Sequence, residues 1–166
     1  FKKNYLFLKK EASEKNFYFL NNKKIKILSI ATHAIEKNSN LYIEPALVLS
    51  FDETESDYGL LTASEIASIN IDAELVILSA CNTASPGLNN ELLLSGLTRA
   101  FLSIGAENLI VSRWPVDSIY TTEFMSLFYS YLNDKSYHES FYLSQKEMKN
   151  KYPDPYYWSS FIFLGI

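Results

Sequence analysis

The most strongly apolar stretches of the chain are short and stop abruptly at small or polar residues. Residues 75–78 (LVIL) show no polar alternation, and Cys81 follows three residues after them. Residues 25–30 (IKILSI) lead to His33 in the same way. Apolar, β-branched runs of this kind are typical of strands covered on both faces, as in a parallel sheet. Because functional groups gather beyond the carboxyl ends of such strands, Cys81 and His33 are candidate functional residues.

The rest of the chain alternates between strand-like and helix-like patterns. Further strands are predicted over residues 5–8, 46–49, 109–111 and 156–163. Helices are predicted over residues 11–20, 62–69, 93–104 and 118–131, and a capping box of Ser136 and Glu139 predicts a last helix that ends before Pro153. Thr62 and Glu65 have the spacing of a capping box, and Asp117 is a candidate N-cap. The alternation predicts one α/β domain over residues 1–166, with a mostly parallel sheet flanked by helices on both faces.

Composition narrows the function classes. The 166 residues include 15 Lys and Arg against 19 Asp and Glu, a net charge of −4, so we expect no direct nucleic-acid binding. No apolar stretch approaches the length of a membrane span, so we expect no membrane association. The single cysteine excludes an internal disulfide framework, and the two histidines lack a metal-binding spacing. We therefore expect a cytoplasmic protein without metal or cofactor.

The pairing of one thiol with one imidazole has two interpretations. A cysteine becomes a nucleophile when its thiolate is populated, and a nearby imidazole can bring this about. His33 and Cys81 are 48 residues apart, from 81 − 33, and they meet at one sheet edge if their strands are neighbours. In the alternative interpretation, Cys81 is a small buried side chain and His33 is a histidine of the core.

Several motifs, taken together, resemble those of CHAT domains, which are caspase-like cysteine peptidases related to separases. They occur in the family's order: IATHA (30–34), LSACNTA (78–84), GLTRAF (96–101), GA (105–106), WPVD (114–117) and YYWSSFIFLG (156–165). The separation of His33 and Cys81 agrees with the caspase spacing of about 50 residues, whereas the local caspase signature around the cysteine is absent.

The resemblance implies a caspase–haemoglobinase fold and a cysteine endopeptidase of clan CD with a His33–Cys81 dyad. Backbone N–H groups of Ala34 and Cys81 would face the oxyanion, although the family usually has Gly at the position of Ala34. A family domain also carries a strand and a helix before residue 1, so we expect this chain to be a fragment. The regulated catalytic part would then adjoin helical repeats or a sensor domain.

The substrate would be a protein or peptide lying across the carboxyl edge of the sheet. Candidate walls of its pocket are Ser79, Arg113, Trp114 and Asp117. Arg113 is long enough to extend into solvent, whereas a carboxylate at a helix start stays near the loop. We therefore expect a basic or neutral residue before the scissile bond.

Two other function classes are compatible with the same residues. An inactive CHAT-like module would serve only as a protein-interaction partner. A doubly wound small-molecule binder would use the same strand ends, with the loop that begins at Ser85 as an anion site before a helix. That loop lacks the lysine and threonine of a P-loop, which disfavours a nucleotide.

Overall fold

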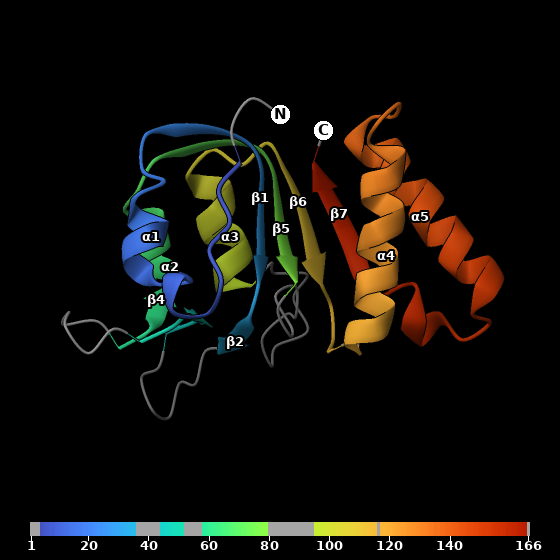
Figure 1. Ribbon diagram of the computed structural model, residues 1–166, viewed down its shortest axis with the longest axis horizontal. Helices are drawn as coiled ribbons and strands as arrows, with labels where there is room; N and C mark the ends of the chain where they lie inside the picture. The colour runs from blue at the N-terminus through green and yellow to red at the C-terminus, as the bar shows by residue number, and fades with distance from the viewer. Residues whose placement is uncertain (1–3, 36–43, 52–57, 80–94, 116, 166) are drawn as a thin grey trace.

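The computed structural model describes residues 4–35, 44–51, 58–79, 95–115 and 117–165. These residues form a four-stranded sheet between two layers of helices, and a smaller three-stranded sheet (Figure 1). The strands of the larger sheet are β1 (Lys23–Ala31), β5 (Ile71–Ser79), β6 (Asn108–Ser112) and β7 (Phe161–Gly165), in the order β1-β5-β6-β7. β1, β5 and β6 are parallel, and β7 is antiparallel to β6. The predicted mostly parallel α/β fold is confirmed.

Burial on both faces explains the apolar runs of β5 and β6. The same expectation is wrong for residues 25–30, because β1 is the edge strand and its residues alternate between half-buried and exposed. In β5, the four side chains from Leu75 to Leu78 are at most 1% exposed, and every residue of β6 is buried. Burying each large aliphatic side chain contributes about 1.5–3 kcal/mol. The central strands therefore stabilise the fold through both of their faces.

The helices form two layers with separate cores. Three short helices cover one face: α1 (Glu14–Tyr18), α2 (Ala63–Ala67) and α3 (Gly96–Ser103). Two longer helices cover the other: α4 (Ser118–Tyr131) and α5 (Tyr137–Lys151). On the first side the rings of Phe17 and Phe101 pack edge to face, with centroids 6.3 Å apart. On the second, Phe124 of α4 stacks on Phe161 of β7 at 5.0 Å, which joins this layer to the sheet.

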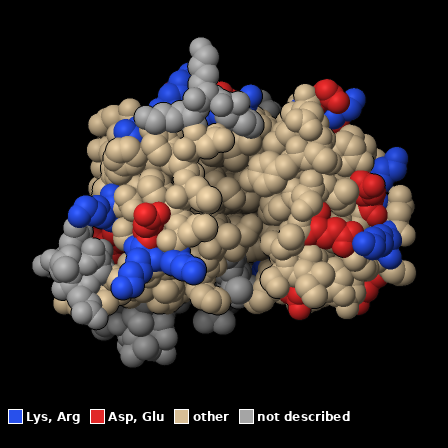
Figure 2. Space-filling view, in the orientation of Figure 1, with Lys and Arg blue, Asp and Glu red and all other residues tan. Residues whose placement is uncertain are grey.

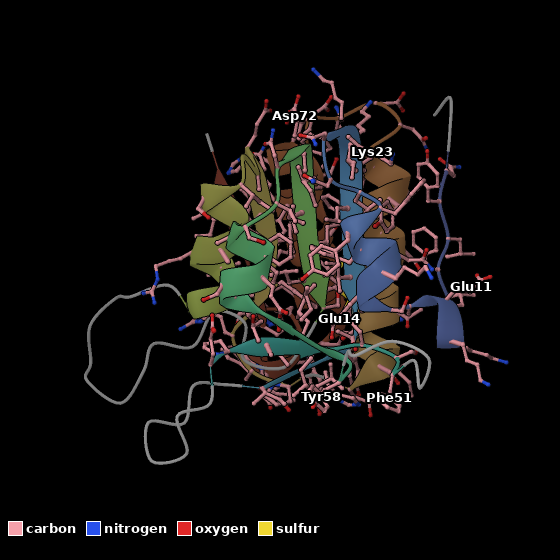
Figure 3. All side chains as sticks on the ribbon, turned by 90° about the vertical axis from the view of Figure 1, so that its left-hand side faces the viewer. Glu11, Glu14, Lys23, Phe51, Tyr58 and Asp72 are labelled. Carbon is pink, nitrogen blue, oxygen red and sulfur yellow. The ribbon has the colours of Figure 1, made fainter. Side chains whose placement is uncertain are left out.

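The smaller sheet lies at the carboxyl end of β1 (Figure 1). It consists of β2 (His33–Ile35), β3 (Ala46–Val48) and β4 (Leu60–Thr62), all antiparallel. Figure 3 shows Phe51 and Tyr58 at this lower end, opposite Lys23 and Asp72 at the amino ends of β1 and β5. The chain leaving β1 thus enters a second sheet at once, and both sheets constrain the residues around the turn.

The predicted helix signals are confirmed. Thr62 and Glu65 form a reciprocal capping box: the Thr62 hydroxyl accepts from Glu65 N at 3.2 Å, and the Glu65 carboxylate accepts from Thr62 N at 2.8 Å. Asp117 is the N-cap of α4. Gly105 follows α3 with φ of 99°, a backbone conformation that favours glycine and ends the helix.

Three predicted elements differ from the structure: one is absent, and two are longer than the elements observed. Residues 4–8 form no regular element, and Leu6 and Leu8 are 73% and 59% exposed, because no described strand pairs with them. The helix predicted over residues 11–20 is only α1, preceded by a 3-10 turn, η1 (Lys9–Glu11). The start of the predicted last strand is a 3-10 helix, η2 (Pro155–Tyr157), because Asp154 caps a turn that begins with proline.

A groove of about 690 Å³ runs along the outer edge of β1. Its walls include residues 4–7, side chains of α1 and β3, and Tyr129 of α4. The face in Figure 2 is hollowed along its centre, and acidic and basic groups are interspersed around it. One end of the groove reaches Ala31 and Thr32, immediately before His33.

Candidate functional site

The carboxyl ends of β1 and β5 lie side by side. Their parallel register has a constant offset of 48 residues, from Lys23 opposite Ile71 to Ala31 opposite Ser79. His33 follows two residues after Ala31, and Cys81 follows two residues after Ser79. Cys81 lies outside the described residues, as does the loop beginning at Ser85. The two strands that carry the candidate dyad are therefore adjacent and parallel, as the dyad requires.

His33 and Ala34 belong to the small sheet. His33 is exposed and pairs with Val48, whose carbonyl also accepts a hydrogen bond from the Thr32 hydroxyl. Ala34 is half-buried and pairs with Leu47, which is fully buried. The backbone on either side of His33 is thus anchored while its imidazole faces solvent.

Ser79, Arg113 and Trp114 lie at the same edge of the sheet. β6 is parallel to β5, with Leu78 opposite Val111, so the residues after β6 emerge beside the end of β5. Arg113 N donates to Ser160 O at 2.8 Å, which extends the β6–β7 ladder by one residue. The Arg113 guanidinium carbon lies 5.2 Å from the centre of the Trp114 ring, within the range of a cation–π contact.

Asp117 has a structural role at the start of α4. One oxygen of its carboxylate accepts a hydrogen bond from Ile119 N at 2.8 Å, and the residue is exposed. A negative charge at a helix N-terminus is also favoured by the helix dipole. The predicted N-cap role of Asp117 is therefore confirmed.

Tyr156 is part of this region, and the sequence pattern did not reveal it. Its hydroxyl donates to Pro115 O at 2.7 Å, and its carbonyl accepts from Trp114 Nε1 at 3.2 Å. The two rings are stacked at 6.1 Å with an interplanar angle of 23°. The run of aromatic residues favours a strand, whereas the turn signal of Asp154 and Pro155 just before it places Tyr156 in η2.

The described residues contain neither a metal-ligand cluster nor a helix able to span a membrane. Within the described ranges, no group of three or more His, Cys, Asp or Glu side chains is placed to hold a metal ion. In the same part of the chain, no helix combines the length and the apolar character that crossing a bilayer requires.

The comparison with protein families decides what the motifs belong to. A family model described as "CHAT domain" matches residues 2–166. This chain belongs to the CHAT family. CHAT domains are related to caspase-like peptidases of clan CD, and the mostly parallel sheet flanked by helices is consistent with that fold.

Two curated relatives of this CHAT chain are much longer proteins. Tetratricopeptide repeat protein 28 of Mus musculus is 31% identical over 109 residues, and its Homo sapiens counterpart is 28% identical over 109 residues. Each alignment covers 64% of this chain and 4% of the relative. The chain thus spans a small part of the length of the curated relatives it matches.

Proposed function

We propose that this CHAT domain is a cysteine endopeptidase in which Cys81 is the nucleophile and His33 is its acid–base partner. The constant 48-residue register between β1 and β5 is the observation that carries the proposal. The same 48 residues separate His33 from Cys81, so the thiol and the imidazole follow neighbouring strands at equal distances along the chain. Membership of a peptidase-related family supports the assignment.

The proposed reaction passes through a covalent intermediate. The Cys81 thiolate attacks the peptide carbonyl carbon and forms a C–S bond. The C–N bond then breaks, and protonated His33 gives its proton to the leaving amine. Water hydrolyses the thioester and restores the thiol. Backbone N–H groups of Ala34 and Cys81 would stabilise the oxyanion.

The proposed substrate pocket lies between the ends of β5 and β6. Ser79, Arg113 and Trp114 are its walls, and Asp117 contributes a carboxylate held by its hydrogen bond to Ile119 N. Because Arg113 lies against the Trp114 ring and Asp117 is fixed at the helix start, we retain a basic or neutral residue before the scissile bond as the expected preference.

We also propose that regions outside this domain provide its partners and its regulation. The curated relatives are named for tetratricopeptide repeats, so protein-interaction regions outside the domain are a reasonable source of substrate or regulation. The same observation favours a second candidate, an inactive domain that only binds other proteins. A reducing cytoplasm is the proposed location, since it would keep Cys81 as a thiol.

Replacing the nucleophile separates the two candidates. We expect Cys81→Ala to abolish cleavage of a peptide library by the protein while its circular dichroism spectrum and thermal midpoint stay close to the wild type. Removing one small side chain beyond a strand end costs little stability. Equal cleavage rates in the wild type and the variant would show that Cys81 is not the nucleophile. Absence of cleavage by the wild type would favour the inactive binding domain.

A further inference from the structure

The segment after β6 extends beyond the hydrogen bonds of the sheet. The β6–β7 ladder ends with Ser112 opposite Phe161, and Arg113 N adds the bond to Ser160 O. Pro115 has no N–H, so it cannot continue the ladder as a donor. Trp114 and Pro115 therefore need another means of holding their place at the sheet edge.

Tyr156 provides contacts to both residues of this segment. Its hydroxyl binds the Pro115 carbonyl, its own carbonyl binds the Trp114 indole N–H, and its ring stacks on the indole. These contacts join residues that are about 40 positions apart in the chain: the two hydrogen bonds span 41 and 42 residues. An offset-stacked aromatic pair and two hydrogen bonds define both the position and the tilt of the indole.

Tyr156 is itself anchored. Asp154 caps η2 by accepting from Tyr156 N at 2.9 Å. The next residue, Tyr157, packs against Tyr120 of α4, with ring centroids 4.2 Å apart. Tyr156, which is 47% exposed, is thus held directly by the cap, and its neighbour Tyr157 joins the same turn to α4. Its exposure leaves one surface of the Trp114–Tyr156 pair open to solvent.

We propose that Tyr156 is a positioning residue of the peptide-binding edge. It holds Trp114, and through the cation–π contact Arg113, beside the strand end that leads to Cys81. The substrate is a polypeptide whose side chains contact this segment, so the inference rests on the proposed peptidase function. Tyr156 takes no part in the chemistry. Its loss therefore affects substrate binding and leaves the bond-breaking step intact.

Two variants of different severity test this role. Tyr156→Phe keeps the stacked ring and removes only the bond to Pro115 O, so kcat/KM for the preferred peptide should fall about fivefold, the worth of one hydrogen bond. Tyr156→Leu also removes the stacking, and the loss should exceed about tenfold. Both losses should arise from KM, with kcat within about twofold of the wild type. Tyr142→Phe, at an exposed tyrosine of α5, is the matched control and should leave kcat/KM unchanged.

A spectroscopic readout accompanies the kinetics in the full chain. The chain has two tryptophans, Trp114 and Trp158, and Trp114→Phe assigns their indole N–H resonances in proton NMR. Tyr156→Leu should shift the Trp114 resonance and leave that of Trp158 in place. Tyr142→Phe should shift neither.

The outcomes distinguish the inference from the function on which it rests. A shifted Trp114 resonance together with a loss in KM supports the positioning role. An unshifted resonance, unchanged KM in an active enzyme, or a loss confined to kcat overturns it while the peptidase assignment stands. A wild-type protein that cleaves no peptide overturns the peptidase assignment, and the substrate-positioning role is then rejected with it.

Discussion

The residues of the candidate site are placed by contacts that differ in range along the chain. Asp117 caps the helix that begins one residue later, and this short-range contact was predictable from the sequence. Tyr156 contacts residues more than 40 positions away, and no local pattern encodes such a pair. His33 and Cys81 could be named from sequence because each follows an apolar run, whereas their positions relative to each other depend on the strand register.

A three-residue cluster between α4 and α5 links stability to pH. The Glu123 carboxylate accepts hydrogen bonds from Lys151 Nζ and the Tyr152 hydroxyl, both at 2.7 Å. The bond from Lys151, followed by that from Tyr152, holds the pKa of Glu123 below its ordinary value. A lowered carboxyl pKa stabilises the folded state above the unfolded-state pKa, and this contribution is lost as pH falls through the folded-state pKa.

Replacing the Glu123 carboxylate therefore has a pH-dependent effect. Glu123→Gln should lower the urea midpoint slightly at pH 7, because a partly exposed ion pair contributes little. The difference from the wild type should shrink below a pH of about 4.3, where unfolded glutamate becomes protonated, and should vanish below the pKa of folded Glu123. Urea titrations across this range measure the effect. A difference that persists unchanged into strong acid would contradict it.

At the scale of elements, the sequence predicts a strand correctly where a continuous apolar run marks burial on both faces. It fails where strand formation depends on a neighbouring strand to pair with. Residues 75–78 of β5 and 109–111 of β6 are buried on both faces of the sheet, and neither run contains a polar residue. Residues 5–8 are equally apolar, yet among the described strands none pairs with them and they form no regular element. The prediction that the last strand begins at residue 156 is wrong, because Pro155 begins a 3-10 helix there. This local preference outweighs the strand preference of the aromatic residues.

The contribution of the α2 capping box to stability can be measured by mutation. α2 has only five residues, so few of its backbone groups are bonded within the helix. Thr62→Ala should lower the free energy of unfolding by about 1 kcal/mol, the typical worth of an N-cap side chain. Thr62→Ser keeps the hydroxyl that accepts from Glu65 N and serves as the control. Equal losses in both variants would assign the effect to packing of the Thr62 methyl group and not to capping.

At the scale of the whole molecule, the parallel sheet brings distant segments to a single edge. The chain reaches His33 just after β1, and it reaches Arg113 and Trp114 just after β6. β5 lies between these two strands and leads to Cys81. β7 and η2 return to the same edge and add Tyr156. The α/β class could be predicted from alternating elements. The adjacency of β1 and β5 was only a condition of the dyad hypothesis, because other predicted elements lie between them in the chain. The placement of the small sheet could not, because its strands have only three residues each.

The rate of alkylation of Cys81 as a function of pH tests the central claim most directly. Cys81 is the only cysteine, so iodoacetamide reports on this thiol alone. If His33 stabilises the thiolate, the wild-type rate should rise with a midpoint below about 7.5, and His33→Ala should move the midpoint toward about 8.5, the value of a free thiol. His138→Ala removes the other histidine, which is exposed on α5, and should leave the midpoint in place. A midpoint near that of a free thiol in both the wild type and His33→Ala would contradict the His33–Cys81 assignment.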